Sequence, residues 1–470
     1  MSTDTVVTLP AAEIARLVRR RELSPTELVD AHLARIDDLN PVLNAFVYVD
    51  RAGARASARE AEAAVLRGQP LGSLHGVPIS IKSAIAVEGM PWETGSRFRS
   101  GVRGDRDAPL VRRLRDAGAI VLGVTNCAEQ LMAWETDNVL YGRTNSPWDL
   151  ARTPGGSSGG ESAAIAAGLS AGGVGSDGGG SIRVPAHFTG TCGLKPTPGR
   201  VPATDHYPTC AGPFALTGVV GPMARTVTDV GLLLSVMAGP DVGDANGHPV
   251  PLGSIADVAP CCVGWFEDDG RTPVTAETRE AVRRAARALA DAGYVVVPFR
   301  PDGLEDARRL WWELFGRALR LLLEPLVEGR ESEVHPNLLE FLEWTRATPR
   351  ISADELLRVE IERDLLRARF RRQMADVPVL LCPVSAVPAF RHGEREWVVE
   401  GRRVHYLDAW SYTAFFNLLQ NPAVAVPAGR SAEGLPIGVQ VVTNPWEEHV
   451  ALAAAAAIER ALGGYVAPAI

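Results

Sequence analysis

Residues 155–198 dominate the interpretation of the chain, and they read GGSSGGESAAIAAGLSAGGVGSDGGGSIRVPAHFTGTCGLKPTP. Glycine and serine are frequent, so much of the backbone is expected to form turns that a larger side chain would obstruct. One helix is predicted in this stretch, over residues 160–168. Buried segments flank and interrupt the stretch, which indicates a site region rich in loops and not a linker between domains.

Helix and strand patterns alternate on both sides of this stretch. Apolar periodicity predicts helices over 11–21, 24–37, 51–67, 107–118, 275–292, 303–325, 353–375 and 449–462, and strands over 119–123, 294–299 and 377–383. The alternation predicts α/β layers. Because no repeat or linker interrupts it, we expect a single domain over residues 1–470, with residues 1–65 as a helical segment packed on it.

Composition restricts the class of partner. The net charge is −8, and proteins that hold nucleic acid usually carry a basic surplus, so a small molecule is the expected partner.

The N-terminus lacks the pattern of a signal peptide, and no run of about 20 apolar residues predicts a membrane span, so we expect a cytoplasmic protein. The six cysteines are scattered without metal-ligand spacing, which favours reduced thiols and no metal site.

The two lysines are conspicuous because arginine supplies every other basic side chain. Of 48 basic residues, only Lys82 and Lys195 are lysines. Arginine stays protonated at physiological pH, whereas a buried lysine can lose its proton and act as a base. Either lysine is therefore a candidate for chemistry, although packing alone would also explain a retained lysine.

Lys82 and two serines in glycine-rich turns suggest nucleophilic catalysis. Lys82 ends the apolar segment Gly76-Val-Pro-Ile-Ser-Ile-Lys82, and Ser157 and Ser181 lie in the two turns. A serine hydroxyl is a poor nucleophile until a base takes its proton, and Ser–Lys arrangements are a known variant of the catalytic triad. Burial would lower the pKa of the lysine. The glycines before Ser181 leave backbone N–H groups free to bind an oxyanion.

Three other interpretations compete with this one. The pattern G-x-S-x-G at 155–159 would make Ser157 the nucleophile of an α/β-hydrolase, but a turn precedes it where that motif needs a strand. The pattern G-x-G-x-x-G at 173–178 fits a dinucleotide site, but no suitable acidic residue follows and we expect a proline-containing loop after it instead of a helix. A purely structural turn would explain one such loop better than it explains two.

Long segments of the chain closely resemble the amidase signature family. The similar segments are LHGVPISIK, NVLYGRTNSPWDLARTPGGSSGGESAAIAAG, GSDGGGSIRVPAHFTGTCGLKPTPGRVP and FFNLLQNPAVAVPAGRSAEGLPIGVQVV. Their order fits the family, as do the spacings of 75 residues from Lys82 to Ser157 and 24 residues from Ser157 to Ser181. The resemblance extends from about residue 8 to residue 465. It implies the amidase signature fold, a single twisted mixed sheet covered by helices on both faces.

The resemblance also implies a mechanism that needs no cofactor. Ser181 would attack an amide carbonyl, Ser157 would relay the proton, and Lys82 would be the base. The peptide bond between Gly156 and Ser157 is expected to be cis. Backbone N–H groups of Ser181 and the glycines before it would form the oxyanion hole: Gly178, Gly179 and Gly180. Supporting hydrogen bonds would come from Ser158, Asp177 and Arg183, while Lys195 would be structural.

Two positions depart from the family pattern. The residue after the lysine is usually acidic, but here it is Ser83. Position 178 is often threonine or isoleucine, but here it is glycine. The first departure bears on how Lys82 is held and the second on the rigidity of the oxyanion loop, but neither removes a catalytic atom.

The substrate is not determined by these motifs. An apolar acyl pocket could be lined by Met132, Trp134, Trp311, Trp312 and Phe315, although core packing explains these side chains equally well. Trp311 and Trp312 are adjacent, so their rings cannot share one helix face. At least one of them is therefore expected to face a cleft or a partner.

The family resemblance leaves four functions open. A free-standing amidase that hydrolyses a small-molecule carboxylic amide to an acid plus ammonia or an amine is favoured. The A subunit of a glutamine-dependent amidotransferase would have an acidic residue before the C-terminal block, where residues 412–416 have none. An allophanate or biuret hydrolase is a narrower option, and an inactive scaffold protein is the non-enzymatic one. Many relatives are dimers, so a homodimer is a further option.

Overall fold

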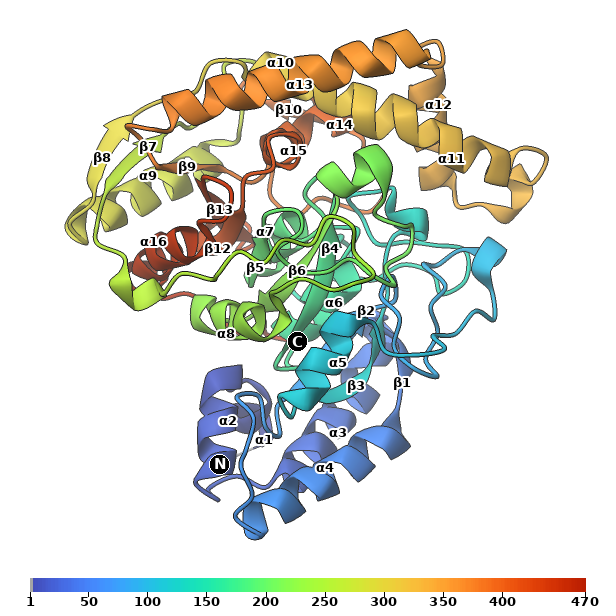
Figure 1. Cartoon of the computed structure of the whole chain (residues 1–470), viewed down its shortest axis with the longest axis vertical. Helices are drawn as coiled ribbons and strands as arrows, with labels where there is room; N and C mark the ends of the chain where they lie inside the picture. Colours follow the sequence, from blue (N-terminus) through green and yellow to red (C-terminus); the bar gives the residue numbers. More distant parts are fainter. Residues whose placement is uncertain (1–2) are drawn as a thin grey trace.

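The computed structural model describes residues 3–470 of the chain (Figure 1). Its strands are β1 Phe46–Val49, β2 Pro78–Lys82, β3 Ile120–Thr125, β4 Gly172–Asp177, β5 Cys192–Lys195, β6 Val219–Ala224, β7 Cys262–Trp265, β8 Val295–Pro298, β9 Val379–Pro383, β10 Glu396–Val399, β11 Arg402–His405, β12 Ala423–Arg430 and β13 Pro436–Thr443. Its α-helices are α1 Thr3–Val7, α2 Ala11–Arg19, α3 Pro25–Leu43, α4 Arg51–Leu66, α5 Pro109–Asp116, α6 Gly159–Ala166, α7 Arg183–Thr189, α8 Val227–Met237, α9 Ala276–Asp291, α10 Leu304–Trp311, α11 Ala318–Val327, α12 Pro336–Arg346, α13 Ala353–Gln373, α14 Tyr406–Ala409, α15 Ser411–Leu418 and α16 Glu448–Leu462.

The centre of the fold is one mixed sheet of 11 strands, in the order β1-β3-β2-β4-β6-β5-β12-β13-β9-β7-β8. Strands β3, β2 and β4 run parallel to one another, as do β9, β7 and β8. The strands between these groups pair antiparallel, and β10 and β11 form a separate hairpin. The predicted α/β fold with a single mixed sheet is therefore confirmed.

Helices cover both faces of the sheet because side chains alternate along each strand. In β12, Val424 and Val426 enter an apolar core shared with α8, α9 and α16. Ala423 and Ala425 point the other way, into a second core that contains side chains of α7, α10 and α15. The site described below lies on the side of this second core.

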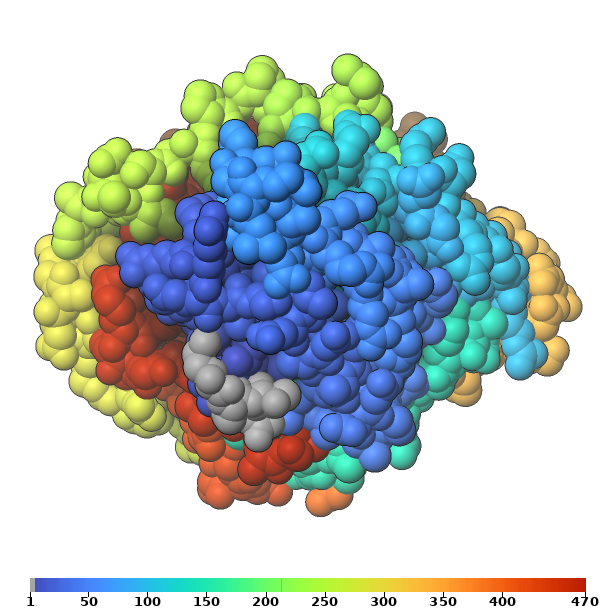
Figure 2. Space-filling view, turned by 90° about the horizontal axis from the view of Figure 1, so that it is seen from below, coloured from blue at the N-terminus to red at the C-terminus, as the bar shows by residue number. Residues whose placement is uncertain are grey.

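The N-terminal segment covers one end of the molecule, where it forms a continuous surface (Figure 2). Helices α2 and α4 match their predicted ranges within two residues, whereas α3 continues to Leu43, beyond the predicted end at residue 37. Ser24 caps α3 by accepting a hydrogen bond from Glu27 N. The segment is not purely helical, which corrects the prediction for residues 1–65. Phe46–Val49 is rich in aromatic and β-branched residues and pairs antiparallel with β3 at the sheet edge. Residues 1 and 2 lie outside the described part of the chain.

The glycine-rich stretch contains more regular structure than its composition predicts. Strand β4 is rich in glycine, but it lies between β2 and β6, whose backbones satisfy its hydrogen bonds. A helix, α7, begins at Arg183, so the expected proline-containing loop is wrong. Pro185 lies in the first turn of that helix, where a backbone N–H has no acceptor within the helix and none is lost.

Candidate active site

Strand alternation directs Lys82 away from the larger apolar core. In β2, Ile79 and Ile81 belong to the core that contains α8, α9 and α16. Ser80 and Lys82 point to the opposite face, toward helix α6 and the loop before it. The strand thus delivers a lysine to the glycine-rich stretch, with its apolar neighbours fixing the direction.

Lys82 Nζ is surrounded by hydroxyl groups and is fully buried. It lies 2.6 Å from Ser157 Oγ, 2.8 Å from Ser158 Oγ and 3.0 Å from Ser176 Oγ. The structure thus brings Lys82, Ser157 and Ser158 together. Ser176 is missing from the sequence-based set, because the glycine-rich sequence does not predict the strand that places it beside β2.

The protonation of Lys82 suits a base. Burial lowers the pKa of Lys82 to about 8. A neutral amine has two N–H groups and one lone pair, so it can donate to Ser158 and Ser176 while accepting the proton of Ser157. Ser158 is set up as an acceptor, because its own hydroxyl donates to the Ser176 carbonyl.

A buried carboxyl group near Lys82 does little to hold the lysine in its charged state. Glu161, on α6, is hydrogen-bonded by Ser80 Oγ at 2.5 Å and Thr125 Oγ1 at 2.8 Å. Burial raises the pKa of Glu161 to about 8. At neutral pH this carboxyl group is largely protonated, so it does not provide a fixed negative charge that would keep Lys82 charged.

The first glycine-rich loop presents Ser157 and Ser158 just before α6. The peptide bond between Gly156 and Ser157 is cis, as the resemblance implied. Ser158 N donates to the carbonyl oxygen of Ser181 at 3.2 Å. This bond joins the first glycine-rich loop to the second, so Ser157 and Ser181 lie in adjoining turns.

Asp177 closes the second glycine-rich loop. Its carboxylate accepts from Gly180 N at 2.7 Å and Ile182 N at 3.1 Å, and it pairs with Arg183 through two guanidinium nitrogens at 3.0 Å each. Neither charged side chain is exposed to solvent. Burial alone would raise the pKa of Asp177, but the Arg183 guanidinium and the Asn417 amide hold it well below its usual range. The loop is therefore built around a permanently ionised carboxylate.

This arrangement divides the predicted oxyanion donors into two groups. Gly180 N–H is already bonded to Asp177, and Gly180 has a φ of 118°, a conformation that favours glycine. Within residues 3–470, the N–H groups of Gly178, Gly179 and Ser181 have no protein acceptor. The structure thus leaves these three donors, and not Gly180, available to an oxygen atom of a ligand.

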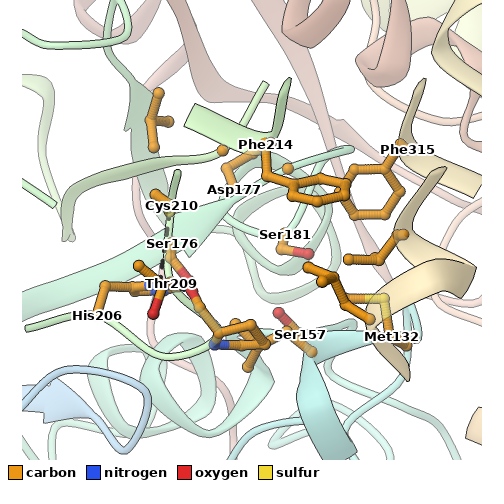
Figure 3. Close-up of a pocket in the computed structure, with 17 residues that line it drawn as sticks. Met132, Ser157, Ser176, Asp177, Ser181, His206, Thr209, Cys210, Phe214 and Phe315 are labelled. Atoms are coloured by element: carbon orange, nitrogen blue, oxygen red, sulfur yellow. Dashed lines mark hydrogen bonds between the residues drawn. The ribbon is translucent and has the colours of Figure 1, made fainter. Parts of the chain in front are cut away.

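Ser181 lies at a cavity with apolar walls and is 8% exposed. Figure 3 shows Ser181 between Phe315 and Met132 on one side and Cys210 and His206 on the other, with Ser157 nearby. In the described part of the chain, the Ser181 hydroxyl makes no hydrogen bond, and none joins it to Ser157. Such contacts between catalytic groups are often long before a substrate binds.

Comparison with known proteins identifies the family of the chain. The sequence profile of the family described as Amidase matches residues 27–452. The chain belongs to the amidase family. The resemblance seen in the sequence is thus confirmed.

Three relatives show how far this amidase matches along its length. It is 34% identical over 463 residues to an acylamidase of Rhodococcus erythropolis, covering 96% of this chain and 95% of that one. It is also 34% identical over 501 residues to the A subunit of the glutamyl-tRNA(Gln) amidotransferase of Salinispora arenicola, covering 99% of each. A solved bacterial aryl acylamidase matches with a TM-score of 0.85 at 28% identity, covering 96% of each chain. The relatives support an amide-hydrolysing enzyme.

The cavity of this amidase includes part of the predicted pocket set. Met132 and Phe315 line the main cavity, and Trp134 lines an adjoining hollow that also reaches Ser181. Trp311 and Trp312 line neither, and Trp312 packs edge-on against Phe341. The main cavity is lined by Leu131, Met132, Ser157, Ser176, Asp177, Gly178, Ser181, His206, Pro208, Thr209, Cys210, Phe214, Gly218, Val219, Phe315, Leu319 and Leu322.

The segment 206–219 contributes much of this lining. The sequence does not predict this role, because the segment carries no motif that marks a site. Burial lowers the pKa of His206 to about 4, so its ring is neutral.

Within residues 3–470, no cluster of side chains is suited to a metal ion, and no helix is long and apolar enough to cross a membrane.

Proposed function

We propose that this amidase hydrolyses small-molecule amides through an acyl-enzyme on Ser181, with Ser157 as proton relay and Lys82 as base. The observation that carries the proposal is the buried Lys82 amine, 2.6 Å from Ser157 Oγ, behind a cavity at which Ser181 lies. A lysine whose pKa is lowered to about 8 can accept a proton near neutral pH.

Acylation breaks the carbon–nitrogen bond in two stages. Ser181 Oγ adds to the amide carbonyl carbon, while its proton passes to Ser157 Oγ and the Ser157 proton passes to Lys82 Nζ. The resulting tetrahedral oxyanion accepts hydrogen bonds from the free N–H groups of Gly178, Gly179 and Ser181. The intermediate then collapses, and Lys82 returns the proton through Ser157 to the leaving nitrogen, which departs as ammonia or an amine.

Deacylation repeats the same transfers with water. Water adds to the ester carbonyl and gives its proton to Lys82 through Ser157. Collapse of the second intermediate returns that proton to Ser181 Oγ and releases the carboxylic acid. The residues of the chain supply every proton acceptor and donor in both halves, so the proposal includes no cofactor.

The cavity favours an uncharged substrate with an apolar acyl or aryl group. Its walls are mainly aliphatic and aromatic, and its one carboxylate, Asp177, is paired with Arg183. An amino acid such as glutamine needs partners for an ammonium and a carboxylate group, and the lining side chains leave no charge free for either. The names of the acylamidase and aryl acylamidase relatives agree with this choice.

A glutamine-dependent amidotransferase is the second candidate function, because a relative of that name matches 99% of the chain. It predicts ammonia release from glutamine that depends on partner proteins. The apolar cavity and the absence of an acidic residue at 412–416 make it the weaker candidate.

The test measures ammonia or amine release from primary aliphatic, aryl, peptide, fatty-acyl and urea-type amides and from glutamine. Ser181→Ala should remove turnover of every substrate that the wild type hydrolyses, because no other hydroxyl takes its place. Ser235→Ala is the control, since within the described residues the Ser235 hydroxyl donates to its own helix, at Leu232 O. Full activity in Ser181→Ala would disprove the assignment, and activity with glutamine alone would favour the amidotransferase.

A further inference from the structure

We propose that Trp311 is a positioning residue for the oxyanion hole, acting through the backbone carbonyl of Gly178. The inference rests on the proposed function and adds a residue that does not line the cavity. Trp311 ends helix α10, and its indole Nε1–H donates to Gly178 O at 3.0 Å. The side chain is 5% exposed, so this bond is shielded from water.

The bond matters because a peptide unit is planar. The carbonyl of Gly178 and the N–H of Gly179 belong to one trans unit and point in opposite directions. Holding the carbonyl therefore aims the N–H of Gly179, one of the three free oxyanion donors. A unit between two glycines rotates at little steric cost, since neither residue has a Cβ that restricts φ and ψ. A lone side-chain donor is thus well placed to prevent this rotation.

The next peptide unit is held in a different way. The Gly179 carbonyl accepts from Trp134 Nε1 and from Thr413 Oγ1, each at 2.9 Å. The N–H of that unit, on Gly180, bonds to Asp177. This unit is fixed at both ends and offers no donor to a ligand. In the unit before it, within the described residues, Trp311 makes the one hydrogen bond to the carbonyl, and the N–H is free.

The aromatic side chains above the loop also account for the glycine at position 178. Phe315 stacks on Trp311 with ring centroids 4.8 Å apart and an angle of 14° between the rings. A Cβ on Gly178 would lie 2.7 Å from Phe315 Cε2, so the ring occupies the space of a larger side chain at 178. The π-helical segment Trp312–Arg317 directly after Trp311 carries this ring, and such segments are common at functional sites. The rigidity that a β-branched residue would give the loop comes instead from the Trp311–Phe315 stack.

The test compares Trp311→Phe with Trp148→Phe. Both substitutions keep an aromatic ring and remove one indole-to-carbonyl bond. Trp148 Nε1 donates to Thr189 O at 2.8 Å, and neither of these residues lines the cavity. Both variants should lose similar thermal stability. Removing one oxyanion donor outright slows an enzyme about 100- to 1,000-fold, so a loosened donor should lower kcat by about tenfold or more in Trp311→Phe. Its KM should stay within about twofold, because Trp311 does not touch the substrate, and Trp148→Phe should keep wild-type kinetics.

A second measurement separates this inference from the proposed function. A fluorophosphonate reacts at a nucleophilic serine without an amide substrate, and its phosphoryl oxygen occupies the oxyanion site. The rate at which it modifies Ser181 should fall in Trp311→Phe by about the same factor as kcat. Equal rates for Trp311→Phe and wild type, or a change in KM alone, would overturn the role of Trp311. A wild type that is modified at Ser181 but hydrolyses no amide would contradict the proposed function and still test the inference; a wild type that is not modified would overturn both.

Discussion

The ends of strands β2 and β5 each carry one of the two lysines of the chain, and both side chains are fully buried. Burial lowers the pKa of Lys82 to about 8 and the pKa of Lys195 to about 7. Their surroundings differ. Lys82 Nζ has three serine hydroxyls within 3.0 Å, whereas Lys195 Nζ donates to one backbone carbonyl, that of Pro196, at 2.9 Å.

The difference shows that a lowered pKa does not by itself make a base. A hydroxyl group can give up a proton and receive another, whereas a carbonyl oxygen has no proton to give. Lys82 is therefore connected to a nucleophile through a chain of transferable protons, and Lys195 is not. If pKa alone decided function, Lys195 would be the stronger candidate, because its amine is neutral over a wider range of pH.

Replacing Lys82 should have the largest effect on the comparison. Lys82→Arg keeps the positive charge but cannot accept a proton, because a guanidinium stays protonated. General base catalysis contributes about 100- to 10,000-fold, so kcat/KM should fall by a factor in that range. Steady-state kinetics on the best amide of the panel measures the loss.

Lys82→Met is the control for crowding by the longer arginine side chain, and it should lose as much activity. Thermal unfolding of both variants checks that the fold is kept. Turnover near the wild-type value in Lys82→Arg would exclude Lys82 as the base.

The pH dependence should give the next largest effect. Lys82 must be neutral to accept a proton, so activity should increase with pH up to its pKa of about 8 and then level off. Between pH 6 and pH 8 the neutral fraction increases about fiftyfold, and kcat/KM should increase in proportion. A flat profile over this range would contradict the assignment.

Glu161 titrates in the same range, because burial also raises its pKa to about 8. Its charged form raises the pKa of Lys82, so Glu161→Gln should keep the profile and leave its midpoint unchanged or lower. A variant at Lys195 should keep the wild-type profile. A pH profile that shifts when Lys195 is replaced would show that the titration belongs to Lys195 and not to Lys82.

The residues proposed to carry the chemistry are easier to recognise in the sequence than the residues that hold them in place. Lys82 stands out because arginine replaces lysine almost everywhere else, and the two glycine-rich turns mark Ser157 and Ser181. These signals are local, since each depends on a residue and its immediate neighbours. The alternation of helices and strands similarly predicts an α/β fold, because each helix and strand has its own spacing of apolar residues.

The supporting contacts come from long-range topology and are not visible in one sequence. Arg183 bonds to Asn417 and Gln440, which lie 234 and 257 residues further along the chain. Asn417 lies on α15 and Gln440 on β13, so both depend on how the C-terminal part of the chain returns to the sheet, an order that apolar patterns do not specify. Similarly, helical spacing predicts that Trp311 and Trp312 face different ways, but only the tertiary structure shows that Trp311 faces the glycine-rich loop.

Replacing Lys195 should give the smallest effect, and it tests the other half of the comparison. Lys195→Met keeps the length and the apolar stem but removes the amine and its bond to the Pro196 carbonyl. One neutral hydrogen bond contributes about 1 kcal/mol, so the free energy of unfolding should fall by about that amount. The values of kcat and KM should stay within about twofold of the wild-type values. Urea unfolding and steady-state kinetics measure the two quantities on the same preparation. A folded Lys195→Met variant with a large loss of kcat would mean that both lysines are needed for catalysis. A hydrogen bond to a serine hydroxyl would then not be the feature that separates a catalytic lysine from a structural one.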